Sequence, residues 1–133
     1  MKTVGIIGGL GPETTAKFYL EVLSSCFKSH NLGRPPMLIF NVPMSFKLEK
    51  EIITASEKKD FFVPFLTNAA IRLEKSGVDF IVIPCNTAHV FIDQVRKLVN
   101  IPVLSIVEES VSFLRDRGMD SIGLLATTQT IEM

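Results

Sequence analysis

Short apolar runs alternate with amphipathic segments along this sequence, and this alternation constrains the fold more than any other feature. Apolar runs of strand length occur at residues 3–7, 37–42, 80–83, 102–105 and 122–126. Between them, apolar residues recur at helical spacing over residues 12–30, 61–75, 107–117 and from Cys85 to about residue 100. Strands that alternate with helices form parallel βαβ units, and continuous apolar runs fit a sheet covered on both faces. We therefore predict an α/β fold with a parallel sheet flanked by helices.

The charge balance and the apolar pattern exclude several classes of function. The 133 residues carry 14 basic and 14 acidic side chains, scattered along the chain, so the formal net charge is zero. This balance leaves no basic patch for nucleic acid or for an anionic membrane. No apolar run reaches the length of a membrane span, and Gly8, Gly9 and Pro12 interrupt the first run too early for a signal peptide. We predict a cytoplasmic protein that binds neither nucleic acid nor membranes.

One cysteine, Cys85, lies where the predicted strand 80–83 gives way to a helix, within the motif PCNTAH at residues 84–89. In parallel sheets, ligands bind beyond the carboxyl ends of the strands. The unpaired N–H groups and the positive dipole at a helix start favour a thiolate, which is a nucleophile or a base. The alternative is an inert buried cysteine, a common state of this residue. We favour a catalytic Cys85, because the end of a strand is a poor place for inert packing.

The other candidate motifs carry weaker signals. The first loop, GGLG at residues 8–11, lacks the third glycine of a dinucleotide-binding turn, so it indicates a tight turn that lets backbone approach a small ligand. His89 follows Cys85 by four residues, but a metal would need two further ligands; we predict no metal and a local capping role for His89. The second cysteine, Cys26, falls on the apolar stripe of the helix 12–30 and is predicted to be core, without a disulfide.

Two segments leave alternatives open. Residues 46–60 are charged and have no wide apolar face, so they form either a solvated surface turn or a lid over the strand ends. Residues 126–130, ATTQT, end the last predicted strand with hydroxyl side chains. These hydroxyls either cap the following helix or bind a carboxylate.

Three blocks of the sequence resemble the aspartate/glutamate racemase family, and aspartate racemases in particular. The blocks are MKTVGIIGGLGP at residues 1–12, DFIVIPCNTAH at residues 79–89 and GLLATTQT at residues 123–130. The resemblance implies two similar α/β domains with the substrate between them and no cofactor. It also implies two cysteines on opposite sides of the substrate α-carbon, one removing the proton as a thiolate while the other protonates the far face. The implied activity is the interconversion of L- and D-aspartate, or of L- and D-glutamate.

The resemblance also gives roles to the residues around the predicted catalytic cysteine. Cys85 corresponds to the first cysteine of the family. Asn86, Thr87 and Ala88 match the loop that holds the carboxylate of the substrate.

Four residues outside this motif complete the predicted substrate-binding set. Thr127 and Thr130 match hydroxyl positions of the third block. Lys47 falls near a basic residue that reads the side-chain carboxylate in some relatives, and Leu10 belongs to the glycine-rich first loop.

The second cysteine of the family lies in a GCTE motif that this sequence does not contain. The resemblance therefore covers the N-terminal half of a family member: an α/β domain at residues 1–119, and the first strand and turn of an incomplete second domain at residues 120–133. Inversion needs an acid and a base on opposite faces of the α-carbon, so we expect racemisation to be impaired. Because the predicted strand 122–126 would leave an apolar edge open, we expect a homodimer.

Two other functions stay open at this point. The first is a related enzyme that acts on hydantoins or malonate derivatives. The second is a non-catalytic half-protein that binds a small carboxylate or a partner chain.

Overall fold

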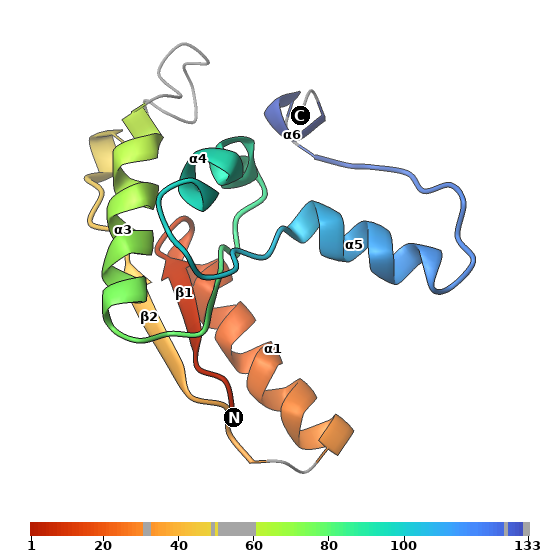
Figure 1. Cartoon of the computed structure of the whole chain (residues 1–133). Helices are drawn as coiled ribbons and strands as arrows, with labels where there is room; N and C mark the ends of the chain where they lie inside the picture. Colours follow the sequence, from red (N-terminus) through yellow and green to blue (C-terminus); the bar gives the residue numbers. More distant parts are fainter. Residues whose placement is uncertain (31–32, 49, 51–60, 127, 132–133) are drawn as a thin grey trace.

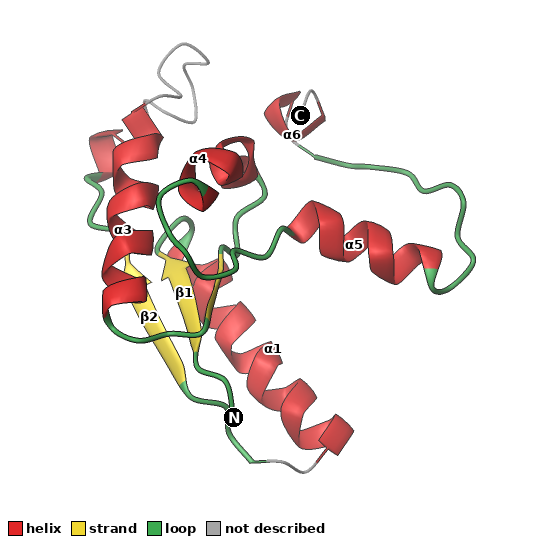
Figure 2. Ribbon diagram, viewed as in Figure 1, coloured by secondary structure: helices red, strands yellow, loops and turns green. Residues whose placement is uncertain are grey.

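The computed structural model describes residues 1–30, 33–48, 50, 61–126 and 128–131. Three parallel strands form a sheet in the order β2-β1-β3, with helices on both sides (Figures 1 and 2). This arrangement confirms the predicted α/β fold. The elements in chain order are β1 (Val4–Gly8), α1 (Pro12–His30), β2 (Met37–Asn41), α3 (Val63–Lys75), β3 (Phe80–Val82), the 3₁₀ helix η2 (Thr87–Phe91), α4 (Ile92–Arg96), α5 (Ile106–Arg115) and α6 (Thr128–Ile131).

The central strand β1 directs alternate residues to opposite faces of the sheet. A side chain at Gly5 would meet Leu73 of α3, and Ile7 belongs to the core that α3 covers. A side chain at Gly8 would instead meet Thr15 of α1. Helix α3 therefore packs on one face and α1 on the other, which explains why all of β1 is buried.

The main core lies between the sheet and α3. This helix buries Leu66, Ala69, Ala70 and Leu73, and it contacts all three strands and α4. Each large aliphatic side chain buried in this way contributes about 1.5–3 kcal/mol of hydrophobic stabilisation. The predicted helix 61–75 is confirmed within two residues, and Gly77 ends it with φ at 80°, a left-handed conformation that favours glycine.

Helix α1 has the predicted bounds but not the predicted burial. Its apolar stripe is largely exposed, with 62% of Leu20 and 76% of Phe27 accessible. Cys26 is half-buried, so its placement in the core was wrong. The helix meets the sheet through the buried Thr15, whereas Leu23 and Cys26 further along its apolar side are only half-buried.

Two predicted strands differ from the structure. The strand at residues 102–105 is reduced to a single parallel bridge between Val103 and Ile81. The strand at residues 122–126 is wrong: this stretch is exposed and irregular (Figure 1). A strand needs a hydrogen-bonded neighbour, and no described segment pairs with these residues. The domain boundary after residue 119 stays a prediction.

Two other expectations are only partly addressed by the described residues. Residues 46–48 form a helical turn, but residues 51–60 lie outside the described part, so the choice between surface turn and lid stays open. Among the helices that the structure describes, none is long and apolar enough to cross a membrane.

Candidate functional site

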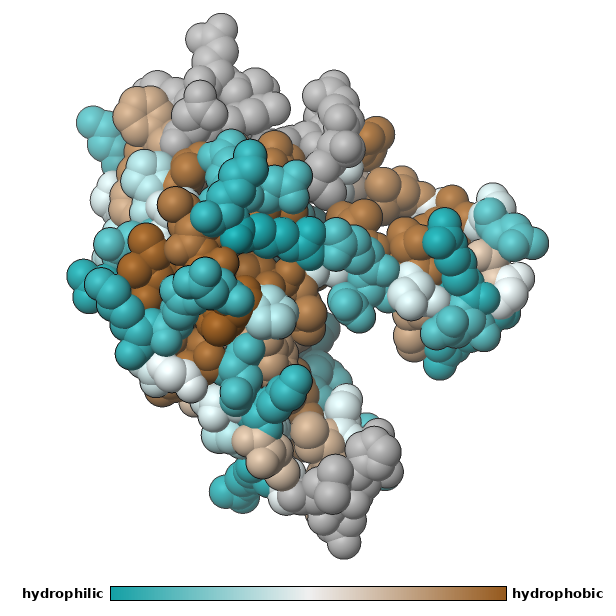
Figure 3. All heavy atoms as spheres, in the orientation of Figure 1, coloured by the Kyte–Doolittle hydropathy of each residue, from teal (hydrophilic) through white to brown (hydrophobic). Residues whose placement is uncertain are grey.

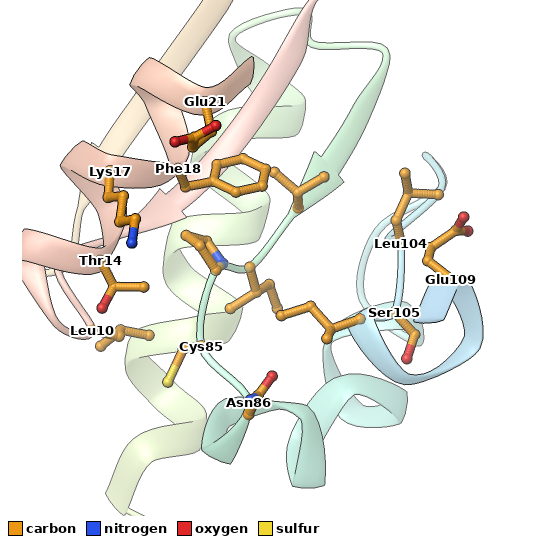
Figure 4. A pocket seen from close by; sticks show the side chains of 14 residues that line it. Leu10, Thr14, Lys17, Phe18, Glu21, Cys85, Asn86, Leu104, Ser105 and Glu109 are labelled. Carbon is orange, nitrogen blue, oxygen red and sulfur yellow. The ribbon is translucent and has the colours of Figure 1, made fainter. Parts of the chain in front are cut away.

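A cavity of about 670 Å³ lies beside the carboxyl end of β3, between α1 and the start of α5 (Figure 4). Three segments contribute its walls: the first loop with α1, the end of β3, and the entry to α5. The residues that line it are Leu10, Thr14, Lys17, Phe18, Glu21, Val82, Ile83, Pro84, Cys85, Asn86, Leu104, Ser105, Ile106 and Glu109.

The glycine-rich first loop is held in a tight turn, as predicted. Gly9 has φ at 85°, and a side chain there would come within 2.6 Å of Asn41 Oδ1. The Thr15 hydroxyl accepts the Gly9 N–H at 3.0 Å and donates to the Gly11 carbonyl at 3.1 Å. This local network fixes the loop, which brings Leu10 to the cavity.

Cys85 lies at the cavity, three residues beyond the end of β3. Its side chain is half-buried, and its backbone N–H donates to the Ile83 carbonyl at 2.8 Å. Burial raises the pKa of the Cys85 thiol, while N–H groups of Ala88 and Thr87 that bond to the sulfur lower the pKa by less. The sequence-based expectation of a thiol made acidic by its surroundings was therefore wrong: the thiol is favoured over the thiolate.

The segment after Cys85 also differs from the expectation. A single helix was expected from Cys85 to about residue 100, but the chain forms the five-residue 3₁₀ helix η2 followed by the five-residue α4. The two are separated at Phe91, where φ is −106° and ψ is 8°. Such short helices align few peptide dipoles, so the electrostatic support for a thiolate is weaker than a long helix would give.

The motif residues after Cys85 reach the site in different ways. Asn86 lines the cavity. Thr87 is half-buried and Ala88 is fully buried, and neither side chain lines the cavity; both contribute N–H groups to the cysteine sulfur. Two backbone donors of this loop therefore serve the cysteine sulfur.

Leu10 lines the cavity, as noted above, but two other predicted residues that the structure describes, Lys47 and Thr130, do not. Lys47 is exposed and does not line it. Thr130 is half-buried on α6, and α6 contacts η2, so the third block does lie beside the segment that follows Cys85. Thr127 lies outside the described residues.

His89 is buried, with 3% of its surface exposed. Its Nδ1 lies 2.8 Å from the Cys85 carbonyl oxygen, and its Nε2 accepts the Ile106 N–H at 2.9 Å. The contact with Cys85 is local, as predicted, but the helix that His89 caps is α5, whose first residue lies 17 residues along the chain, so the prediction of a purely local capping role was wrong. Within the described residues, no three His, Cys, Asp or Glu side chains are grouped so that they could hold a metal ion.

Sequence reasoning missed the contribution of α1 to the cavity. Thr14, Lys17, Phe18 and Glu21 line it from one face of this helix. Their spacing of three, four and seven residues after Thr14 is the signal that could have revealed them, since such positions share a helical face. Lys17 brings a positive charge to the cavity, and Glu21 and Glu109 bring negative charges.

Comparisons with known proteins agree with the fold and with the sequence motifs. The sequence model of the Asp/Glu/Hydantoin racemase family matches residues 7–133. The broad specificity amino-acid racemase of Bacillus subtilis is 34% identical over 133 residues, which cover 97% of this chain and 56% of that protein.

Solved structures of racemase homologues also resemble this chain. An aspartate racemase homologue from Pyrococcus horikoshii aligns with a TM-score of 0.75 and 32% identity, over 89% of this chain and 50% of that one. The aspartate racemase of Picrophilus torridus aligns with a TM-score of 0.74 and 27% identity, over 99% of this chain and 55% of that one. The chain thus spans about half the length of the relatives it matches.

Proposed function

Because the chain belongs to the Asp/Glu/Hydantoin racemase family, we propose that it supplies one side of a cofactor-independent racemase site in which Cys85 carries the α-proton of an acidic amino acid. The observation that carries this proposal is the Cys85 thiol at a cavity beside the strand end. The aspartate racemase names of two structural relatives support an acidic substrate.

The proposed chemistry is a proton transfer at the α-carbon. The Cys85 thiolate accepts the α-proton, which leaves a carbanion stabilised by the adjacent carboxylate group; the Cys85 thiol returns a proton in the reverse step. Because burial raises the pKa of Cys85, only a small fraction is thiolate at neutral pH, and this fraction starts the exchange by taking the α-proton. We propose that Asn86, Thr87 and Ala88 form the loop that holds the substrate carboxylate, and that Lys47, Thr127, Thr130 and Leu10 are further substrate contacts.

Inversion requires a second proton carrier on the opposite face of the α-carbon. The other cysteine of these 133 residues, Cys26, does not line the cavity. We therefore propose that these residues exchange the α-proton on one face and invert the amino acid only slowly. The alternatives are a hydantoin or malonate substrate, or binding of a small carboxylate without catalysis.

Aspartate is expected to protect Cys85 from alkylation. A bound amino acid would place its α-carbon against the sulfur and block iodoacetamide, so the labelling rate of Cys85 should fall as aspartate is added. Peptide mass spectrometry would measure both cysteines in one sample, and Cys26 serves as the internal control because it lies outside the cavity. Equal protection of both cysteines, or stronger protection by malonate or hydantoin than by aspartate and glutamate, would contradict the proposed substrate.

We also propose that the chain forms a homodimer in the cytoplasm. Helix α5 buries none of its residues and exposes apolar side chains, including 45% of Val107 and 40% of Val111 (Figure 3). A second copy of the chain would remove this surface from water. The two free cysteines suit a reducing compartment.

The Val111→Glu substitution is expected to shift the protein from dimer to monomer, because it would bury a charge in the proposed interface. Light scattering across a range of protein concentrations would give the mass. Ser112→Glu adds the same charge at the next, exposed position of α5 and is expected to leave the dimer intact. A monomer mass of the unsubstituted chain at every concentration would rule out the dimer.

A further inference from the structure

We propose that His89 is a positioning residue that fixes two walls of the cavity relative to each other. One ring nitrogen lies 2.8 Å from the carbonyl oxygen of Cys85, and the other accepts the N–H of Ile106 at 2.9 Å. Both Cys85 and Ile106 line the cavity, but His89 does not. A single buried ring thus connects the loop that carries the thiol to the first residue of α5.

The two hydrogen bonds define which nitrogen of the His89 ring carries the proton. A backbone N–H can only donate, so Nε2 of His89 must be the unprotonated nitrogen that accepts from Ile106. The remaining proton of the neutral imidazole is then on Nδ1, which donates to the Cys85 carbonyl. In any other protonation state, at least one of these contacts would join two donors or two acceptors.

Ile106 has no alternative acceptor in its own helix. It is the first residue of α5, and the first N–H groups of a helix lack partners within it. The N-cap residue, Ser105, accepts the N–H of Glu108 at 3.4 Å, so its hydroxyl serves another donor. The bond to His89 therefore gives the first N–H of α5 its partner and links the start of α5 directly to the Cys85 loop.

This inference rests on the proposed function, because positioning has a consequence only if Cys85 acts on a substrate in the cavity. A displacement of about 1 Å at a reacting group can cost about 10²-fold in rate. Loss of either hydrogen bond would remove the link through His89 between the Cys85 loop and the α5 entry. We expect such a loss to lower proton exchange at the substrate without unfolding the chain.

The hydrogen-bond pattern can be tested on the unsubstituted chain by NMR. With ¹⁵N-labelled histidine, the His89 ring is expected to show a protonated Nδ1 and an unprotonated Nε2. The Ile106 amide is expected to exchange slowly with heavy water, although its position in the first turn of a helix would ordinarily leave it unprotected. A protonated Nε2, or a rapidly exchanging Ile106 amide, would overturn the inference.

Two substitutions separate the two bonds. His89→Asn can keep a donor near the Nδ1 position, whereas His89→Gln can keep an acceptor near the Nε2 position. The Ile106 amide is expected to lose protection in His89→Asn and to keep it in His89→Gln. Both variants are expected to slow α-deuterium incorporation into aspartate by between about ten- and a hundredfold.

A matched control is Glu108→Gln, which breaks the 2.7 Å ion pair between Glu108 and Arg96 in the first turn of α5 but touches neither bond of His89. It is expected to leave the Ile106 amide protected. Full exchange activity in both folded His89 variants would overturn the positioning role while leaving the proposed function intact. The unsubstituted chain could instead show no exchange although its His89 ring and Ile106 amide behave as expected. That result would overturn the proposed function, and the catalytic effect of positioning would fall together with it.

Discussion

Replacing Cys85 with serine is expected to lower the rate of α-proton exchange by about 10²–10⁴-fold, the usual contribution of a general acid or base. Serine keeps nearly the same volume at this half-buried position, so the fold should survive. A hydroxyl is a far weaker acid than a thiol, so it supplies almost no anion to accept the α-proton. The rate would be measured by ¹H NMR, as loss of the α-proton signal of aspartate in heavy water.

The matched variant for this experiment is Cys26→Ser. It removes the other thiol of the chain, which is half-buried on α1 and does not line the cavity. Its exchange rate is expected to equal that of the unsubstituted chain. If Cys85→Ser retained the full rate, or if Cys26→Ser lost it, Cys85 would not be the proton carrier.

The reactivity of Cys85 is expected to rise steeply with pH and to reach its midpoint above the pKa of an ordinary cysteine. Burial raises the pKa of the Cys85 thiol, so ionisation requires a higher pH than for a free thiol. Below that pKa, the reactive thiolate increases about tenfold with each pH unit, so alkylation should accelerate about a hundredfold over two units. Iodoacetamide labelling of the Cys26→Ser variant, compared with glutathione, would give this profile.

The direction of the shift is the informative result. At neutral pH, Cys85 should react more slowly than glutathione, because a smaller fraction of it is ionised. A midpoint at or below the pKa of an ordinary cysteine would mean that the N–H groups of Ala88 and Thr87 outweigh burial. Only a midpoint below neutral pH would make the thiolate the resting form, as the sequence alone had suggested.

Features set by local sequence were predictable. Helix α1 has the predicted bounds because Pro12 suits the first turn and the apolar spacing continues to His30. Gly77 adopts the positive φ expected of a residue that ends a helix. The strand that precedes Cys85 was predicted within one residue, since its residues pair with β1 and its central residue, Ile81, is fully buried. A few neighbouring residues determine each of these features.

Features that depend on distant partners were not predictable in the same way. The stretch 122–126 has the composition of a strand but no described neighbour to pair with. The burial of the Cys85 thiol depends on surrounding segments, and its effect exceeds that of the nearby N–H groups. His89 could be identified as a capping residue, but its partner Ile106 lies 17 residues away and follows from the fold.

The most direct measurement is the isotope content and configuration of aspartate after incubation with the unsubstituted chain in heavy water. L- and D-aspartate would be tested separately, with Cys85→Ser as the blank. If one thiol carries the proton on one face, deuterium should enter the α-carbon of at least one enantiomer. The configuration of that enantiomer should be largely retained. No deuterium above the blank in either enantiomer would contradict proton transfer by Cys85.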